Sequence, residues 1–201
     1  MRLGIFGGSF DPVHYGHLLL AESCLEQCQL DRLWLVPAAI PPHKQDRQLA
    51  PSSARVEMLK LALGGHHQIE VSETEIKRGG ISYTVETLTE IKSDHPDSQL
   101  FFLMGADNLQ YLPSWKQPEQ LCNLASPIVV SRAGSSEPDF EQLTSVVSNE
   151  RLTEIRQYQV TMPLIDLSSS EIRNRVAQGK SIRYHTPRAV EQYIKNQELY
   201  R

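Results

Sequence analysis

The chain of 201 residues is long enough for one α/β domain with a substantial core and too short for two comfortable ones, so we predict a single domain over residues 1–201. A hydrophobic content of 40%, a charged content of 22% and a net charge of −4 show no excess of Lys and Arg, which argues against nucleic acid as a partner. An apolar run of about 18 residues and a signal-peptide pattern are both missing, so we expect neither a membrane span nor a membrane partner.

The three cysteines are an odd number and lack a paired metal spacing. Cys24 and Cys28 lie four residues apart on an expected helix, where buried free thiols are a better interpretation than zinc ligands. Free thiols, with Cys122 as the third, fit a reducing cytoplasm, which is the location we expect.

The most informative stretch is residues 3–20, LGIFGGSFDPVHYGHLLL, which predicts a buried strand, a glycine turn, a short polar loop and then a helix. A strand that runs through Gly7 and Gly8 into a helix aims free backbone N–H groups and the positive helix end at one point, which suits a phosphate. His14 and His17 lie three residues apart and therefore share a face of that helix. The pattern predicts a nucleotide site.

Gly16 stands between the two histidines and lacks a Cβ, so a triphosphate could come close to the helix backbone there. Each feature also has a plainer interpretation. Glycines after a strand often make only a tight turn, and a helical histidine is often a surface or core residue. The order and context of these residues favour the nucleotide site.

Along most of the chain, apolar runs alternate with helical patterns, which predicts a Rossmann-like α/β fold: an open parallel sheet with helices on both faces. The expected strands after the first are 32–37, 69–71, 100–104, 127–131 and a short one within 160–167. The expected helices are about 14–28, 52–63 with Ser52 as its cap, one opening over 81–88, one after 168–170, and 187–196. We assign no structure or function to the polar residues 135–158.

Two loops and one helix start are candidates for binding anions. In Pro41-Pro42-His43-Lys44 the prolines stiffen the backbone while His43 and Lys44 project from it, although a plain surface loop is equally compatible with the sequence. The hydroxyl-rich helix start at Thr84 could hold a carboxylate or simply cap itself. The loop Leu167–Arg173 repeats the order strand, hydroxyl-rich loop and helix, and its serines could again be only caps.

Three further features lie at expected strand ends or loops. Asp107 follows a central strand, at the edge where open α/β sheets bind ligands, and could accept bonds from ribose hydroxyls, hold metal-bound water or cap the next helix. Trp115 is either a core filler or a stacking surface for a planar ring of a ligand. Residues 167–201 carry seven Lys or Arg and three Asp or Glu, so they could supply cations to phosphates or form a solvated face.

The stretch GSFDPVHYGH resembles the H-x-G-H motif of the nucleotidyltransferase superfamily, and GGSFDPVHYGH is similar to the motif of bacterial nicotinate-nucleotide adenylyltransferases. LSSSEIR resembles the superfamily's second phosphate motif, I-S-S-T-x-I-R, with differences at Leu167 and Ser170. The resemblance spans essentially the whole chain and implies transfer of the adenylyl group of ATP to nicotinate mononucleotide, in NAD biosynthesis. It implies in-line attack of the mononucleotide phosphate on the α-phosphorus, without a covalent intermediate.

The same resemblance implies roles for individual residues. The catalytic residues that hold the ATP phosphates are His14, His17 and Arg173. Other ATP-binding residues are Gly7, Gly8, Ser9, Phe10, Gly105, Asp107, Arg132, Ser168 and Ser169. The mononucleotide is bound by His43, Lys44, Thr84, Trp115 and Lys116. The sequence offers no dedicated metal cage, so Mg²⁺ is expected through the ATP phosphates and water.

Other functions stay open at this point. The acceptor could be nicotinamide mononucleotide or another small molecule such as phosphopantetheine, or the chain could be a nucleotide sensor without turnover. A dinucleotide oxidoreductase and a P-loop enzyme are disfavoured, because the first turn lacks G-x-G-x-x-G and no G-x-x-x-x-G-K-[ST] occurs. The sequence also leaves open whether the chain forms a homo-oligomer.

Overall fold

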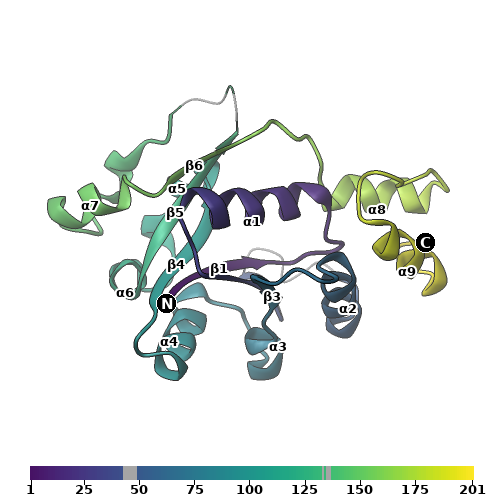
Figure 1. The fold of residues 1–201 in the computed structure, drawn as a ribbon, viewed down its shortest axis with the longest axis horizontal. Helices are drawn as coiled ribbons and strands as arrows, with labels where there is room; N and C mark the ends of the chain where they lie inside the picture. Colours follow the sequence, from purple (N-terminus) through teal and green to yellow (C-terminus); the bar gives the residue numbers. More distant parts are fainter. Residues whose placement is uncertain (43–48, 133, 135–136) are drawn as a thin grey trace.

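A computed structural model describes residues 1–42, 49–132, 134 and 137–201, and these build an open sheet flanked by helices (Figure 1). The strands pair in the order β3-β2-β1-β4-β5-β6, and every neighbouring pair is parallel. Their bounds are β1 (Arg2–Gly8), β2 (Arg32–Pro37), β3 (Ile69–Val71), β4 (Gln99–Gly105), β5 (Ala125–Arg132) and β6 (Gln159–Met162). The predicted α/β fold with an open parallel sheet is confirmed.

The helices lie in the connections between the strands. Their bounds are α1 (Tyr15–Gln27), α2 (Ser52–Ala62), α3 (Thr74–Arg78), α4 (Thr84–Asp94), α5 (Ala106–Leu109), α6 (Pro118–Leu124), α7 (Asn149–Ile155), α8 (Ser169–Ala177) and α9 (Arg188–Asn196), with short 3-10 turns η2 (Leu112–Ser114) and η3 (Phe140–Leu143). Helix α2 begins at Ser52, but its N-cap is Pro51, so the predicted Ser52 cap is wrong by one residue.

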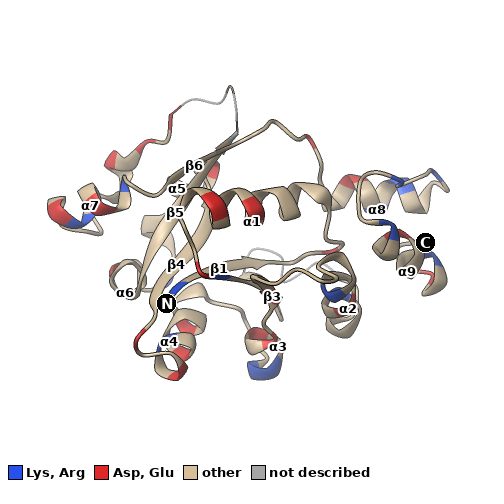
Figure 2. Ribbon diagram, viewed as in Figure 1, with Lys and Arg blue, Asp and Glu red and all other residues tan. Residues whose placement is uncertain are grey.

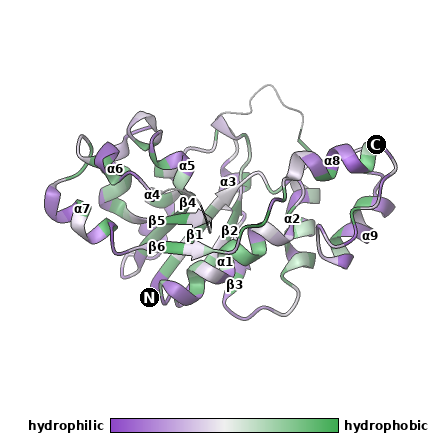
Figure 3. Ribbon diagram, turned by 90° about the horizontal axis from the view of Figure 1, so that it is seen from above, coloured by the Kyte–Doolittle hydropathy of each residue, from purple (hydrophilic) through white to green (hydrophobic). Residues whose placement is uncertain are grey.

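Strand β4 shows why a continuous apolar run makes a central strand. Phe101 and Leu103 face one hydrophobic cluster, whereas Leu100, Phe102 and Met104 face the other. Because successive side chains of a strand point to opposite faces, a sheet covered on both faces needs apolar residues at every position. Figure 3 shows this as hydrophobic colour along the strands of the sheet.

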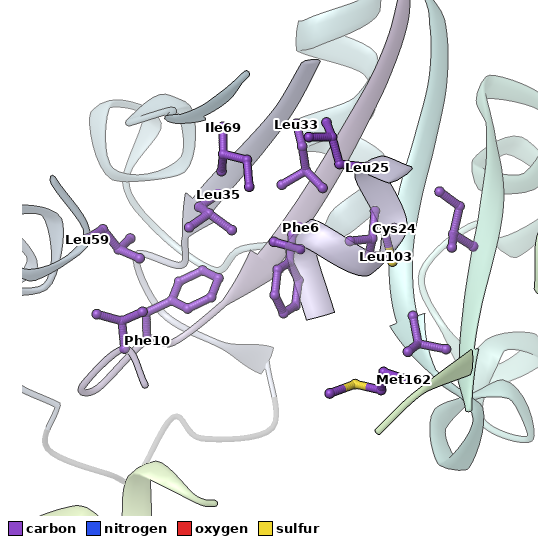
Figure 4. Packing of buried hydrophobic residues seen from close by; sticks show 14 of the residues in the cluster. Phe6, Phe10, Cys24, Leu25, Leu33, Leu35, Leu59, Ile69, Leu103 and Met162 are labelled. Atoms are coloured by element: carbon purple, nitrogen blue, oxygen red, sulfur yellow. The ribbon is translucent and has the colours of Figure 1, made fainter. Parts of the chain in front are cut away.

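Different helices cover the two faces. Helices α1 and α2 contribute to the cluster around Phe6 and Leu35, which Figure 4 shows from close by. Helices α4, α6 and α7 contribute to the cluster around Ile5 and Phe102. In Figure 1, α1 and α4 accordingly lie on opposite sides of the sheet. Among the described residues, no helix is both long and apolar enough to traverse a lipid bilayer.

The three cysteines are free and buried in these two clusters. Burial raises the pKa of Cys24 and of Cys28, and it raises the pKa of Cys122 to about 11. At neutral pH all three are therefore protonated thiols that pack as small hydrophobic side chains. The predicted buried free thiols are confirmed.

Several short elements were not predicted, α3, α6 and α7 among them. Helix α3 has five residues, too few for an apolar period to be recognised. The segment after β5 contains η3 and α7, whose Leu143 and Ile155 are completely buried against the sheet. The segment is mostly polar and only one side of each short element is apolar, so its sequence did not indicate these contacts.

Candidate active site

The first and fourth strands lie side by side in the middle of the sheet, with Ile5 opposite Phe102. Strands β2 and β3 continue the sheet on the side of β1, and β5 and β6 continue it on the side of β4, so the strand order reverses between β1 and β4. Open α/β sheets bind ligands at the carboxyl ends of such a pair, which here are Gly8 and Gly105. Two motifs of the sequence, the glycine turn and the G-A-D-N segment, therefore meet at one edge of the sheet.

The two glycines of the first turn have different reasons to be glycine. A Cβ at Gly8 would lie 2.9 Å from the ring of Phe10, which is closer than packing allows. A Cβ at Gly7 would meet no atom within 4 Å, so Gly7 leaves open space over the end of β1. Gly8 thus serves the packing of the turn, and Gly7 can admit a ligand.

Phe10 lies beneath this turn with a backbone φ of 46° and an exposed fraction of 1%. Its ring packs edge-to-face against Phe6, with centroids 5.3 Å apart (Figure 4). It packs in the same way against His17, with centroids 5.1 Å apart. The ring supports His17 from below and faces the core. Any contact of Phe10 with ATP would therefore come from its backbone.

His14 is the N-cap of α1, and His17 stands at the third helical position. Their rings stack, with centroids 3.7 Å apart and an interplanar angle of 25°. The backbone N–H of His14 donates to Nδ1 of His17 at 3.2 Å. A ring nitrogen that accepts carries no hydrogen, so in neutral His17 the hydrogen is on Nε2, where it can be donated to a phosphate oxygen.

His14 is buried, with an exposed fraction of 6%, and its Nδ1 has no hydrogen-bond partner among the described residues. Burial lowers the pKa of His14 to about 4, so the imidazole is neutral at pH 7. A buried polar nitrogen without a partner is costly in the free protein. It is therefore suited to a hydrogen bond that a ligand would complete.

Gly16 is explained by the histidine pair. A Cβ at Gly16 would lie 3.0 Å from Nδ1 of His14 and 3.1 Å from its Cε1. We predicted that Gly16 admits a triphosphate to the helix backbone, but the contact seen is with the His14 ring. Glycine at this position lets the ring lie over the first turn of α1.

Helix α8 lies at the N-terminal end of α1 (Figure 1), and its hydroxyl groups hold it there. Ser168 is the N-cap, and its Oγ accepts from the N–H of Glu171 at 3.1 Å. Ser169 donates from Oγ to the carbonyl of Pro12 at 2.9 Å. The capping alternative is thus realised for Ser168, and Ser169 ties α8 to the loop that precedes His14.

Arg173 belongs to the same contact. Its Nη1 donates to the carbonyl oxygen of Asp11 at 2.7 Å, and its Nη2 donates to Oγ of Ser170 at 3.3 Å. The backbone of Tyr15 also donates to the carbonyl of His185, in the loop between α8 and α9. Figure 2 shows several Lys and Arg positions on α8, α9 and this loop. The three residues predicted to be catalytic therefore come from segments that are bonded to one another.

A cavity of about 320 Å³ extends from the glycine turn of β1 towards α4. It adjoins a second cavity of about 190 Å³, with which it shares Pro42, Ser82, Thr84 and Trp115. Together they join two groups of residues that are far apart in the sequence. The first cavity is lined by Gly7, Gly8, Ser9, Glu75, Thr87 and Asn108 among others, and the second adds Tyr83, Val85 and Lys116.

Thr84 occupies the first position of α4 and lines both cavities. The N-cap is Tyr83, whose side chain makes no capping hydrogen bond, so the idea that Thr84 caps this helix is wrong. The start of α4 consequently presents its positive end to the cavity without a side-chain cap. This position suits a carboxylate.

Trp115 is half-buried, lines both cavities and lies 6.4 Å from Phe102 between ring centroids. Next to it, the ammonium of Lys116 bonds Glu86 of α4 at 2.5 Å and lies 4.3 Å from the centre of the Tyr83 ring. Lys116 thus holds the tryptophan segment against the start of α4, which leaves its backbone N–H as the group that could serve a ligand.

At the end of β4 the structure changes one expectation. The N-cap of α5 is Gly105, and Asp107 is an exposed residue of that helix, so Asp107 does not cap it. Asn108, which we did not predict, lines the larger cavity.

Arg132 ends β5, but its side chain is outside what the structure describes. His43 and Lys44 lie outside the described residues.

Glu75 is a cavity residue that the sequence analysis missed. It is buried in the short helix α3, with an exposed fraction of 5%. Its Oε1 accepts from Oγ1 of Thr87 at 2.6 Å, and Arg78 donates to the same hydroxyl oxygen at 2.9 Å. The only signal in the sequence was an acidic residue shortly before the Gly79-Gly80 break, which does not distinguish it from a surface carboxylate.

The chain is similar to known proteins over almost its whole length. Residues 5–175 match the family model described as "Cytidylyltransferase-like". A protein of Rhodopirellula baltica is 39% identical over 199 residues, which cover 99% of this chain and 93% of that protein. A protein of Thermomicrobium roseum is 44% identical over 200 residues, which cover 100% and 92%. Both carry the name "Probable nicotinate-nucleotide adenylyltransferase".

A solved structure of Plasmodium falciparum nicotinic acid mononucleotide adenylyltransferase, complexed with NaAD, has a TM-score of 0.74 to this chain at 20% sequence identity. The match covers 99% of this chain and 97% of that one. At 20% identity this match shows similarity of the fold alone.

Proposed function

Because this chain belongs to the cytidylyltransferase-like family and, within it, to the nicotinate-nucleotide adenylyltransferases, we propose that its site transfers the adenylyl group of ATP to nicotinate mononucleotide and releases pyrophosphate. The product is a dinucleotide, and the reaction belongs to NAD biosynthesis. The observation that carries the proposal is the cavity that joins the turn Gly7–Ser9 to Thr84 and Trp115. One end offers backbone groups for phosphates, and the other offers an aromatic face and an uncapped helix start.

The ATP phosphates lie, in this proposal, between the start of α1 and the start of α8. His17 donates from Nε2, neutral His14 offers a second ring nitrogen, and Arg173 supplies a permanent positive charge. The open space over Gly7 admits the nucleotide at the end of β1. Five further residues remain proposed ATP contacts: Ser168, Ser169, Gly105, Asp107 and Arg132.

The nicotinate ring lies against Trp115, with its carboxylate at the start of α4. Stacking on an aromatic face contributes about 0.5–1.5 kcal/mol beyond area burial. The first N–H groups of α4 and the N–H of Lys116 would bind the carboxylate oxygens. His43 and Lys44 remain the proposed partners of the mononucleotide phosphate.

The reaction needs no general base, because the attacking phosphate of the mononucleotide is already an anion. Its barrier comes from bringing two anions together while negative charge gathers on the departing pyrophosphate. Holding both substrates in line and placing donors where that charge develops should therefore supply most of the catalysis. A neutral His14 and an Nε2-protonated His17 suit this role, because they act as fixed hydrogen-bonding groups.

Mg²⁺ fits the site as an ion that ATP carries. Within residues 1–42, 49–132, 134 and 137–201, no three His, Cys, Asp or Glu side chains gather into a metal site. In proteins Mg²⁺ commonly keeps several waters and is bound through phosphates with one or two carboxylates. Asp107, exposed after β4, could accept hydrogen bonds from such a water. When bound, Mg²⁺ neutralises charge on the β and γ phosphates.

The test is pyrophosphate release by the purified chain with ATP, Mg²⁺ and either nicotinate mononucleotide or nicotinamide mononucleotide. We expect release with both and a higher kcat/KM for the acid, since a carboxylate at a helix N-terminus gains charge stabilisation that an amide lacks. Faster turnover of the amide would reverse the acceptor assignment. ATP binding without pyrophosphate release from any mononucleotide would mean that the chain is a nucleotide sensor. The cytoplasm stays our expected location, in keeping with the buried free thiols.

A further inference from the structure

A buried carboxylate lies beside the proposed ATP site and has no role in the account above. Asp11 has an exposed fraction of 1% and stands between the glycine turn and His14. Its Oδ1 accepts from the hydroxyl of Tyr200 at 2.6 Å and from the backbone N–H of Ala50 at 3.2 Å. Asp11 lines neither of the two cavities described above.

The second carboxylate oxygen faces a catalytic candidate. Oδ2 of Asp11 has no hydrogen-bond partner among the described residues, and Nη1 of Arg173 lies 3.7 Å from it. The same Nη1 donates to the Asp11 carbonyl at 2.7 Å. Asp11 therefore contacts Nη1 of Arg173 with two groups, its carbonyl oxygen by a hydrogen bond and its carboxylate by opposite charge.

Arg55 keeps this arrangement in place. It is almost completely buried, with an exposed fraction of 2%, and interacts electrostatically with Asp11. Its guanidinium donates to the carbonyl oxygens of Ser9 at 3.0 Å and Ala50 at 3.1 Å. Two arginines thus compensate one buried carboxylate, as a buried charge requires.

Tyr200 supplies the remaining donor. Burial, together with the hydrogen bond to Asp11, raises the pKa of Tyr200, so the phenol stays protonated and donates at neutral pH. A short bond from a hydroxyl to an ionised carboxylate is stronger than a bond between neutral groups. It joins residues that are 189 positions apart, between the segment after α9 and the first loop.

We propose that Asp11 and Tyr200 are a positioning pair for Arg173: the Tyr200 hydroxyl fixes the Asp11 carboxylate, which in turn fixes the guanidinium in the orientation that binds the ATP phosphates. The inference rests on the proposed role of Arg173. Neither residue of the pair touches substrate, so both act through Arg173. A merely structural anchor would instead affect the free energy of unfolding without any dependence on Arg173.

The chain contains a matched control for the tyrosine. Tyr193 and Tyr200 are both half-buried, and both pack against the cluster around Phe6. Tyr200→Phe removes the hydroxyl that binds Asp11, and Tyr193→Phe removes a hydroxyl from the neighbouring helix. Asp11→Asn is the second variant, because it keeps the shape of the side chain and removes its charge.

The experiment is a double-mutant cycle on ATP binding, measured by titration calorimetry without mononucleotide, and on kcat/KM for ATP. In the wild-type background, we expect Tyr200→Phe and Asp11→Asn each to lower the affinity for ATP and kcat/KM for ATP by about tenfold. Tyr193→Phe should leave the affinity and kcat/KM unchanged. In the Arg173→Ala background the same changes should cost less than about twofold, because the group that they position is gone. Thermal unfolding of every variant shows whether the fold is intact.

Full additivity of Tyr200→Phe with Arg173→Ala would overturn the proposal, as would a lower Tm for Tyr200→Phe with unchanged ATP binding. If Arg173→Ala itself leaves ATP binding and turnover unchanged, the role of Arg173 is wrong and the pair has nothing to position. Failure of the proposed function is a separate result: wild-type chain that binds ATP but releases no pyrophosphate would leave the binding cycle intact as a test of the pair.

Discussion

The ring of His14 lies 3.7 Å from that of His17 between centroids, and the His14 backbone N–H donates to Nδ1 of His17. One residue thereby sets both the orientation and the tautomer of the other. The edge of Phe10 supports His17 from the core side. The H-x-G-H segment therefore holds its two imidazole rings in a fixed relative orientation.

His17→Ala should lower kcat far more than it raises the KM for ATP, by about a hundredfold against less than about threefold. The reason is that a donor placed where charge develops binds the transition state more strongly than it binds the ground state. Steady-state kinetics with both substrates measure the two constants. His67→Ala, at an exposed position far from α1 in sequence, is the control. Equal losses in binding and turnover would contradict the role of His17.

Gly16→Ala should lower kcat/KM by about tenfold or more while lowering Tm by no more than about 8 °C. The new Cβ would lie 3.0 Å from the His14 ring, which must then shift by a few tenths of an ångström relative to His17. Such crowding costs about 1–3 kcal/mol and alanine is preferred over glycine in a helix by about 1 kcal/mol, so the net loss of stability is at most about 2 kcal/mol.

The control for this prediction is Gly64→Ala, whose Cβ would meet its nearest neighbour at an ordinary 3.6 Å. It should leave activity unchanged. If Gly16→Ala retains full activity, the stacked arrangement of the two histidines is not needed for turnover.

The central features of this site could be predicted because they are local in sequence. The alternation of apolar runs and helical patterns predicted the strands, and the glycine turn with His14 and His17 predicted the start of α1. For Trp115 and for Thr84 the sequence allowed both a ligand-binding and a purely structural role. In the structure both residues line the same two cavities. A short sequence pattern is enough to predict a part of the site when all its residues lie in one strand, turn or helix.

The contacts that position the site could not be predicted in the same way. The bond between Tyr200 and Asp11 joins distant positions, and nothing in the composition around either residue indicates the other. Glu75 lies in a helix too short to show a period. The N-cap of α4 is Tyr83, where propensity favoured Thr84, and the Tyr83 side chain makes no capping hydrogen bond.

Trp115→Ala should raise the KM for nicotinate mononucleotide by about tenfold and leave the KM for ATP within about twofold. Loss of ring stacking accounts for about 0.5–1.5 kcal/mol, and the lost apolar contact adds to it. Trp115→Phe keeps an aromatic face and should recover most of the affinity. Steady-state kinetics with each substrate varied in turn provide the measurement, and an unchanged KM for the mononucleotide would remove Trp115 from the acceptor site.

The stability of the chain should fall as the pH drops from about 6.5 towards 4, in a way that depends on His14. Burial lowers the pKa of His14 from its ordinary value of 6.5 to about 4, so between these values the unfolded chain binds a proton that the folded chain does not. The free energy of unfolding therefore rises with pH in this window. Above it both states are neutral, and the full contribution, of the order of 3 kcal/mol, is present.

His14→Gln removes this titration and keeps a polar side chain of similar reach. Urea unfolding of both proteins at pH 7.0, 5.5 and 4.5 (roughly spanning the window) measures the effect as the difference between their slopes against pH. The other acidic and basic groups titrate alike in the two proteins, so they cancel in that difference. Parallel slopes would mean that His14 is protonated in the folded chain at pH 5, and the neutral imidazole assigned to the ATP site would then be wrong.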